Sequence, residues 1–360
     1  MLCLVSLAAA CSHSEPFSNP QGNDRPFDPG PPARLTLNPA HDGNPAWLAD
    51  GSGIVYSAQQ LERTDNDVCL AELPPGGGSH LRLDCDIPGE RTTTDAVQSP
   101  APALDGRLAF VSAGNGGIGG PTPVLLGIAV SPTLDAVNGQ TVRSLPFAPD
   151  GGTTQAYAGY LRWLTSERLV YVGQRFQTFL PCRGCILDTL ISGTEVTVLD
   201  VGGGTGSALP GTLSATGVAP IQEGAAILYT LFGDTRIYTR ALSSGAVGVF
   251  HDFGPGQVVR DVHAGGNRVA AVVGGRIGFS VVPDIGATQW DSGGVLHVLD
   301  SDGGGEVVLD TPGRLYRRPA VSPDGSRVVA EGLPLIVTAT GMGVDTTVSR
   351  SGDLYLFGAE

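Results

Sequence analysis

The sequence predicts an all-β protein: a six-bladed β-propeller of four-stranded antiparallel blades. One phrase recurs six times, and its tight turns fall at Asp50, Asp105, Ser166, Glu223, Gly265 and Asp324. Each copy is followed by alternating apolar and polar residues between Gly-rich or Ser-rich turns, a pattern typical of β-hairpins. Helical periodicity is almost absent. Repeats about 40 to 60 residues long therefore indicate blades arranged in a ring.

The recurring phrase is an extended segment, a tight turn and a β-rich run. Its fullest copy is Pro319-Ala-Val-Ser-Pro-Asp-Gly-Ser-Arg-Val-Val-Ala330. The other copies begin at Pro45, Pro102, Leu161, Ala219 and Val262. The Asp-Gly pair predicts a two-residue hairpin turn, and the Trp or Val near the start is expected to pack between blades. A blade cannot bury both faces alone, so neighbouring blades must pack on it and the ring must close.

The two ends of the chain predict how the ring closes. The sixth unit stops after its third strand, near 353–357, and lacks an outer strand. Residues 33–38 alternate in polarity and precede the first unit without a partner of their own. We expect them to complete the last blade, because a bare edge would expose unpaired backbone groups.

The repeat units resemble a known family. Their form, Pro-x-Trp/Val-Ser/Leu-x-Asp-Gly-x-x-Ile/Val-x-Phe/Tyr, is similar to the WD-repeat-like motifs of TolB-like propellers, and the resemblance covers residues 33–360. It implies a six-bladed propeller that acts as a binding scaffold in the bacterial cell envelope. The motif itself is a scaffold element, so the resemblance names no ligand.

The N-terminus predicts export. Residues 1–11 form a short apolar run that ends in small residues, as in a secretory signal. Leu7-Ala8-Ala9-Ala10-Cys11 resembles a bacterial lipoprotein signal, which implies that Cys11 is the lipidated first residue of the mature protein. An ordinary signal with an incidental Cys is the alternative. Residues 12–32 are Pro-rich and predict a flexible tether, so we expect a periplasmic or outer-membrane-anchored protein.

Cysteine usage agrees with export. Of six cysteines, Cys3 lies in the signal and Cys11 at its end, which leaves an even number for disulfides in an oxidising compartment. We predict the local pairs, Cys69–Cys85 and Cys182–Cys185. The alternative for the second pair is half of a zinc site or a redox pair.

Composition excludes several functions. A net charge of −14 argues against nucleic-acid binding, which needs clustered cations. The chain has no lysine, so Schiff-base and P-loop lysine chemistry are excluded. The sequence also lacks Gly-x-Ser-x-Gly, His-Glu-x-x-His and EF-hand patterns.

The long loops between second and third strands predict where a site lies. They run about 58–66, 112–123, 174–193, 274–293 and 331–352, and they share one face of the ring with the blade-to-blade connections. Trp290 lies on one of them. The polar candidates nearest the channel are His41, Asp42, Arg162, Arg260, His263, Arg317 and Arg318. Arginines recognise carboxylates and phosphates, so they predict an anion site. The alternatives are that they pair with channel carboxylates or lie on outward faces.

Two function classes follow. The first is a binding module: an exported, lipid-anchored propeller whose long-loop face docks a protein or peptide of the cell envelope. It would act as a monomer, need no cofactor, bind no nucleic acid and touch the membrane through its anchor alone. The second is a propeller enzyme, a hydrolase, lyase or quinoprotein. It would use the channel mouth with a divalent metal held near His41 and His263.

Overall fold

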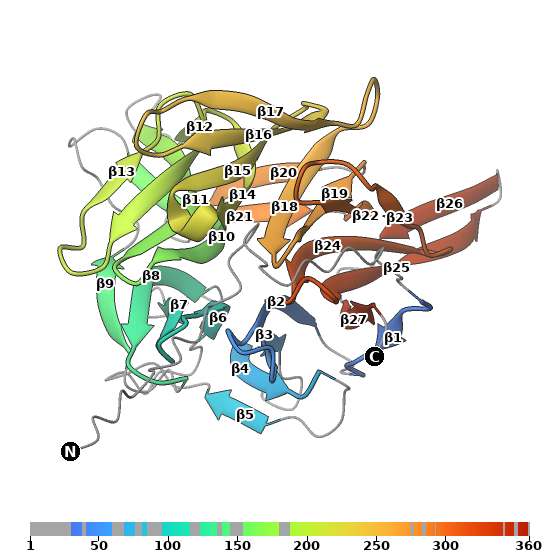
Figure 1. Ribbon diagram of the computed structural model, residues 1–360, viewed down its shortest axis with the longest axis horizontal. Coiled ribbons are helices and arrows are strands. Elements are labelled where there is room, and N and C mark those ends of the chain that lie inside the picture. Colours follow the sequence, from blue (N-terminus) through green and yellow to red (C-terminus); the bar gives the residue numbers. More distant parts are fainter. Residues whose placement is uncertain are drawn as a thin grey trace, which may run out of the picture.

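Six blades of antiparallel strands follow one another along the chain and close into a ring, as the computed structural model shows in Figure 1. The structure describes residues 30–37, 41–59, 68–75, 81–84, 96–115, 123–134, 139–144, 154–179, 188–274, 277–282, 286–291, 293–340, 343–348 and 352–358. In each blade the first strand lies innermost and its successors follow outward. The inner strands of consecutive blades contact one another around the whole ring.

The first three blades have regular four-stranded order. Blade 1 contains β2 (Asp42–Trp47), β3 (Ile54–Gln59), β4 (Val68–Leu73) and β5 (Leu81–Asp84). Blade 2 contains β6 (Ala96–Pro102), β7 (Leu108–Asn115), β8 (Pro123–Ser131) and β9 (Gln140–Ser144). Blade 3 contains β10 (Thr154–Thr165), β11 (Arg168–Phe179), β12 (Asp188–Asp200) and β13 (Gly206–Ala208). A single parallel pair, Val68 with Ala96, joins blades 1 and 2.

The last three blades carry two insertions. Blade 4 contains β14 (Ala215–Ile221), the 3-10 turn η2 (Gln222–Gly224), β15 (Ala226–Leu231), β16 (Arg236–Ala241) and β17 (Val247–Asp252). Blade 5 contains β18 (Val259–Gly265), β19 (Arg268–Val273), β22 (Val295–Asp300) and β23 (Val307–Leu309), with the inserted hairpin β20 (Ile277–Val282) and β21 (Gly286–Asp291). Blade 6 contains β24 (Arg314–Val321), β25 (Val328–Thr340), β27 (Asp353–Phe357) and β1 (Ala33–Arg34), and β26 (Gly343–Val348) extends β25.

The N-terminal strand closes the ring, as the sequence predicts. β1 runs antiparallel to β27, with Ala33 opposite Leu356 and Arg34 opposite Tyr355. The Leu35 amide then donates to the Leu354 carbonyl over 2.8 Å. The chain therefore enters blade 6 at the end of β27 and runs toward the start of that strand.

The core is divided among the blade interfaces. Six apolar clusters of described residues each join two neighbouring blades. Successive residues of one strand serve opposite clusters: Val329 packs toward blade 1, whereas Val328 and Ala330 pack toward blade 5. The alternation of a β-strand therefore binds each blade to both of its neighbours.

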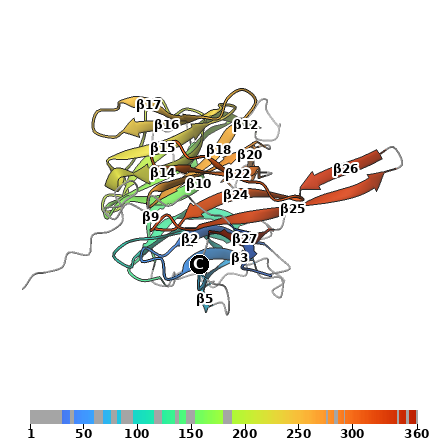
Figure 2. The ribbon, with the colours of Figure 1, turned by 45° about the vertical axis from the view of Figure 1, so that its right-hand side comes forward.

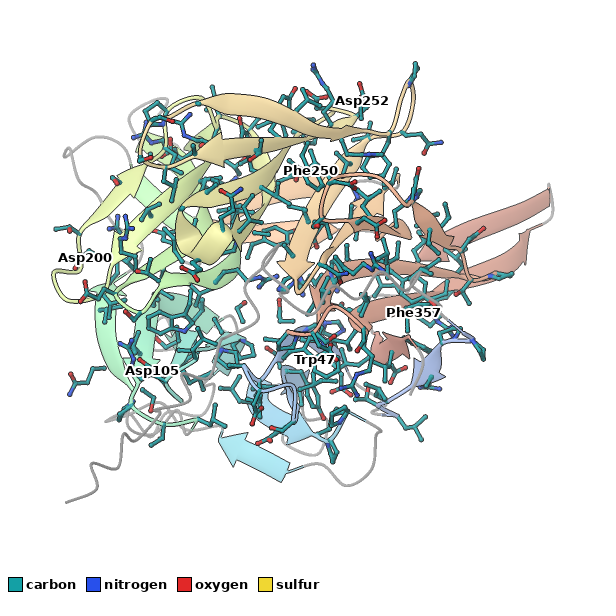
Figure 3. The ribbon with its side chains drawn as sticks, viewed as in Figure 1. Trp47, Asp105, Asp200, Phe250, Asp252 and Phe357 are labelled. Carbon is teal, nitrogen blue, oxygen red and sulfur yellow. The ribbon has the colours of Figure 1, made fainter. Side chains whose placement is uncertain are left out.

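A tryptophan lock recurs at two interfaces. The Trp47 indole donates to the Ala320 carbonyl of blade 6 over 2.9 Å, and the Arg327 guanidinium lies 4.9 Å from its ring. Trp163 repeats this arrangement with the Ala101 carbonyl of blade 2 at 2.7 Å, beneath Arg107. Figure 3 shows Trp47 and Phe357 where the first and last blades meet. The expected packing of tryptophan between blades is thus observed.

The Asp-Gly pairs also form tight turns, but each loop is longer than the two-residue turn that the sequence predicts. The Leu48 amide donates to the Gly53 carbonyl and the Ser322 amide to the Arg327 carbonyl, so each of these turns contains four residues. The Ala103 amide donates to the Arg107 carbonyl, so that turn contains three. Asp50, Asp105 and Asp324 each accept a hydrogen bond from the backbone amide two residues later. The glycine after each aspartate has a positive φ, between 73° and 85°, which suits glycine better than any residue with a side chain. No described helix has the length and hydropathy needed to cross a bilayer.

Candidate functional site

Three long hairpins project from one face of the ring: β11–β12, β20–β21 and β25–β26. The segments 174–193 and 331–352, expected as loops, are largely strands: β11 and β12 continue pairing to Phe179 and Asp188, and β25 and β26 pair to Thr340 and Gly343. Figure 2 shows the β25–β26 hairpin, hereafter the arm, standing clear of the blades. The predicted face is therefore present, but ordered strand pairs build it.

The β20–β21 hairpin reaches across the ring. It leaves blade 5 between β19 and β22, yet its strands lie against β10 and β12 of blade 3. Blades 3 and 5 are separated by blade 4, so the hairpin links two blades that are not neighbours in the ring. Trp290 lies in β21 opposite Gly278, and its side chain falls outside the described part of the chain.

Every inner strand is interrupted near the channel. The pairing between first and second strands shifts register in all six blades. Four bulge residues adopt a left-handed backbone: Asn44, Ser99, Tyr160 and Arg318. Side chains of the preceding blade bind two of the displaced amides. The Ser99 amide donates to Ser57 Oγ over 3.2 Å, and the Arg318 amide donates to Asp261 Oδ2 over 2.9 Å.

The most highly charged part of the site surrounds Glu331. This carboxylate lies on β25, at the base of the arm, and has no exposed surface. Arg317 Nε donates to Glu331 Oε1 over 2.6 Å, and Arg318 Nη1 donates to Oε2 over 3.3 Å. His41 Nε2 lies 3.1 Å from Oε1. We call these four residues the Glu331 cluster.

The cluster keeps its carboxylate ionised. Burial alone would raise the pKa of Glu331, but the guanidinium of Arg317, then the adjoining His41 and the guanidinium of Arg318, hold it well below the usual range. Arg317 and Arg318 therefore pair with a channel carboxylate, which is one of the three roles that the sequence left open for them.

His41 connects the first and last blades through two side-chain contacts. Its Nδ1 accepts a hydrogen bond from the Gly352 amide over 3.0 Å, so the ring proton lies on Nε2, facing Glu331. Both ring nitrogens are thus used in these contacts. The next residue adds a main-chain contact between these two blades, because the Asp42 amide donates to the Gly352 carbonyl over 2.9 Å. A metal bound at His41 would have to displace one of the two contacts.

His263 and Arg162 belong to a different part of the channel. The Val321 amide donates to His263 Nδ1 over 3.1 Å, joining blade 5 to blade 6. Burial, and secondly the charge of Arg162, lowers the pKa of His263 well below its usual value. Because Arg162 lies on blade 3, these two side chains act on each other across the channel.

The remaining candidates are buried on inner strands. Arg260 is at the bulge of β18 and is 3% exposed. The Asp42 side chain is also buried. After burial itself, its charge is the second cause that raises the pKa of Tyr56. The structure thus gathers His41, Arg317 and Arg318 in one cluster and places the other candidates around the channel.

Sequence reasoning missed Glu331, which binds the two guanidinium groups, and Asp261, which accepts from the Arg318 amide. Glu331 interrupts the apolar run Val328-Val-Ala-Glu-Gly-Leu333, and that lone charge in a buried strand was the available signal. Asp261 sits between Arg260 and Val262 without such a signal. Within the described ranges, no three His, Cys, Asp or Glu side chains come together as a metal site. Cys11, Cys85, Cys182 and Cys185, and the side chain of Cys69, lie outside the described part, so their pairing and lipidation stay predictions.

We expect His263 to make the protein less stable in mild acid. Its folded-state pKa is depressed, so the unfolded state binds a proton that the folded state does not as pH falls below about 6.5. Stability is full above that pH and declines below it, by up to about 1.4 kcal/mol per pH unit. In His263→Asn, the urea midpoint should change less between pH 6.5 and 5.5 than in wild type. His251→Asn is the control, and identical pH slopes for wild type and His263→Asn would refute the assignment.

Comparison with known proteins agrees with this architecture. No protein-family model and no curated sequence matches the chain. A gluconolactonase from Xanthomonas campestris is 15% identical with a TM-score of 0.52, over 92% of this chain and 91% of that one. Regucalcin, a calcium-binding protein from Agrobacterium tumefaciens, is 13% identical with a TM-score of 0.51, over 91% and 93%.

TolB from Acinetobacter baumannii is also similar. It is 17% identical with a TM-score of 0.49, and the match covers 84% of this chain but 65% of TolB. At these identities the similarities concern the fold alone. The protein is an all-β propeller whose ring is sealed by its N-terminal strand. More particularly, it is a six-bladed propeller, the fold class to which these solved structures point.

Proposed function

We propose that this propeller is a binding module whose hairpin face docks a protein or peptide of the cell envelope. The arm carries the proposal. Blade 6 already has its four strands in β24, β25, β27 and β1, so the arm is not needed to complete it. A two-stranded ribbon is marginally stable by itself, and it exposes unpaired backbone along its edges. Binding a partner explains why such a ribbon extends from this face.

The N-terminal sequence supplies the second part of the proposal. A lipid on Cys11, followed by the tether 12–32, would hold the protein on a membrane in the envelope, where it acts as a monomer. The direction of β1 supports this arrangement, because the chain enters blade 6 at the face opposite the arm. The hairpin face would then be turned away from its point of attachment. Palmitate labelling of wild type, absent in Cys11→Ala, is the expected result.

The arm can be shortened without touching the blade. Replacing Val337–Thr346 by Asn-Gly leaves Ile336 opposite Thr347 across a two-residue turn. Crosslinking and pull-down from native envelope membranes, read by mass spectrometry, should recover one partner near stoichiometrically with the wild-type protein. The short-arm protein should lose that partner. Val247→Ser/Val249→Ser alters two exposed residues on the outer strand of blade 4 and should retain it. Equal recovery with the short arm would refute a docking role for the arm.

A metal-dependent enzyme is the second candidate, and His263 is the observation in its favour. A neutral imidazole beside the channel is the form that binds metals and accepts protons. Lactone hydrolysis is the reaction to assay first, because one neighbour of the same fold is a gluconolactonase. Calorimetric titration with Ca²⁺, Mn²⁺ and Zn²⁺ should show a site that His263→Ala removes. If binding and activity are unchanged in a His41→Ala/His263→Ala protein, this candidate loses its proposed residues.

A further inference from the structure

The inner edge of β25 continues beyond its neighbour in blade 6. β24 pairs with β25 as far as Arg314 opposite Pro334. One more hydrogen bond follows, from the Leu335 amide to the Gly313 carbonyl over 2.9 Å. β25 then runs on to Thr340, and no described strand pairs with it on that side. Among the described strands, the position directly in line with β24 is therefore open.

The direction of the Leu335 amide fixes which groups face this position. Backbone amides along a strand point alternately to its two sides. Because Leu335 donates toward β24, the amides of Val337 and Ala339 point to the same side. Those of Ile336 and Thr338 point toward β26, where their pairing residues are Thr347 and Asp345. The open edge thus offers the main-chain donors and acceptors of Val337 and Ala339 to one further strand.

We propose that an extended segment of the partner protein pairs with this edge as an added strand, antiparallel to β25 and in line with β24. The inference rests on the proposed binding function and names its mode. Strand addition takes its affinity from main-chain hydrogen bonds and its specificity from alternate side chains. The stretch 336–340 contains no Lys, Arg or Pro, the residues that commonly protect an edge strand from pairing.

Charge identifies the kind of segment. The protein carries a net charge of −14, and the single charged residue between 335 and 348 is Asp345. A cationic segment is therefore attracted, whereas a second copy of this chain is repelled. We assign the position to a Pro-free segment that alternates β-branched and basic residues.

The test uses peptides selected from a phage-displayed library of 12-residue sequences on the folded, full-length protein. One selected peptide is synthesised with a fluorescent label, and binding is measured by anisotropy. Val337→Pro/Ala339→Pro removes the two outward amide donors and keeps those that bind β26. We expect it to weaken binding about tenfold or more, since each lost hydrogen bond contributes about 1 kcal/mol. Val344→Pro/Thr346→Pro makes the same change on the opposite edge of the arm and should bind as wild type does.

Hydrogen exchange keeps the test decisive if a proline variant misfolds. Adding the peptide to wild-type protein should slow exchange at the Val337 and Ala339 amides, with little change at Leu335, which is already bonded. Equal binding to both proline variants, or protection at the β26 edge alone, would overturn the proposal while leaving a docking role for the arm. A dimer that Val337→Pro/Ala339→Pro dissociates would also overturn it, because the occupant would then be a second copy. Peptides that bind even the short-arm protein would count against the proposed function itself.

Discussion

Replacing Glu331 by alanine is expected to lower the free energy of unfolding by about 3 to 5 kcal/mol, as measured by urea denaturation. The carboxylate is fully buried and contacts Arg317, Arg318 and His41. Its removal leaves the guanidinium groups of Arg317 and Arg318 in a low-dielectric environment without their counter-charge. The decrease in the free energy of unfolding should exceed that of an ordinary core truncation of similar size. The variant leaves a cavity, as any truncation does, and it also leaves buried guanidinium groups unpaired.

Two companion variants separate charge from packing. Glu331→Gln keeps the shape of the side chain and removes its charge. We therefore expect it to lower the free energy of unfolding by most of the amount that Glu331→Ala does. Glu331→Leu/Arg317→Leu removes one charge of each sign and should recover part of the stability. Glu167→Gln, at an exposed turn, should stay within about 0.5 kcal/mol of wild type. If Glu331→Gln matched this control, the cluster would have no stabilising role.

Trp47→Ala is expected to lower the free energy of unfolding by about 3 to 5 kcal/mol, the range for removing a buried aromatic side chain. Trp47 is the lock between the first and last blades and packs in the cluster that also contains Leu35 and Leu356. The variant loses this packing and leaves the Ala320 carbonyl without its indole donor. We expect a lower urea midpoint and faster proteolysis, because the seam of the ring is weakened.

Trp163 provides the matched comparison. Trp163→Phe and Trp47→Phe each remove one hydrogen bond, to Ala101 and Ala320 respectively, and should cost about 1 to 2 kcal/mol. Trp163 joins two blades that are also consecutive in the chain, whereas Trp47 joins its two ends. Proteolysis should therefore be faster in Trp47→Phe than in Trp163→Phe. Equal rates would show that the seam is no weaker than the other interfaces.

The sequence predicts the scaffold well because the scaffold is repeated. The turns at Asp50, Asp105 and Asp324, the closing strand at Ala33 and the tryptophan between blades are all local patterns whose geometry follows from few residues. The same pattern in each repeat also supports the interpretation of the others. Six copies of a hairpin pattern therefore determine the ring more firmly than any single strand would.

The long hairpins and the Glu331 cluster could not be predicted from local sequence patterns in the same way. Residues 331–352 interrupt the blade pattern and read as a loop, although β25 simply continues past the blade and pairs with β26. Glu331 owes its role to Arg317, Arg318 and the distant His41. Only the closed ring brings His41 to it, so local sequence could not reveal the contact. Individual cations were therefore predictable as candidates, but their common partner was not.

The pairing of β1 with β27 has a topological consequence. Because the two ends of the described chain are neighbouring strands of one blade, the ring itself has no first or last blade. A circularly permuted chain that joined residue 360 to residue 30 and began at the exposed turn near Phe232 could form the same ring. The seam would then lie within blade 4, and the order of the blades would be unchanged. Packing between neighbours fixes that order, and the position of the chain ends decides only which blade is completed last.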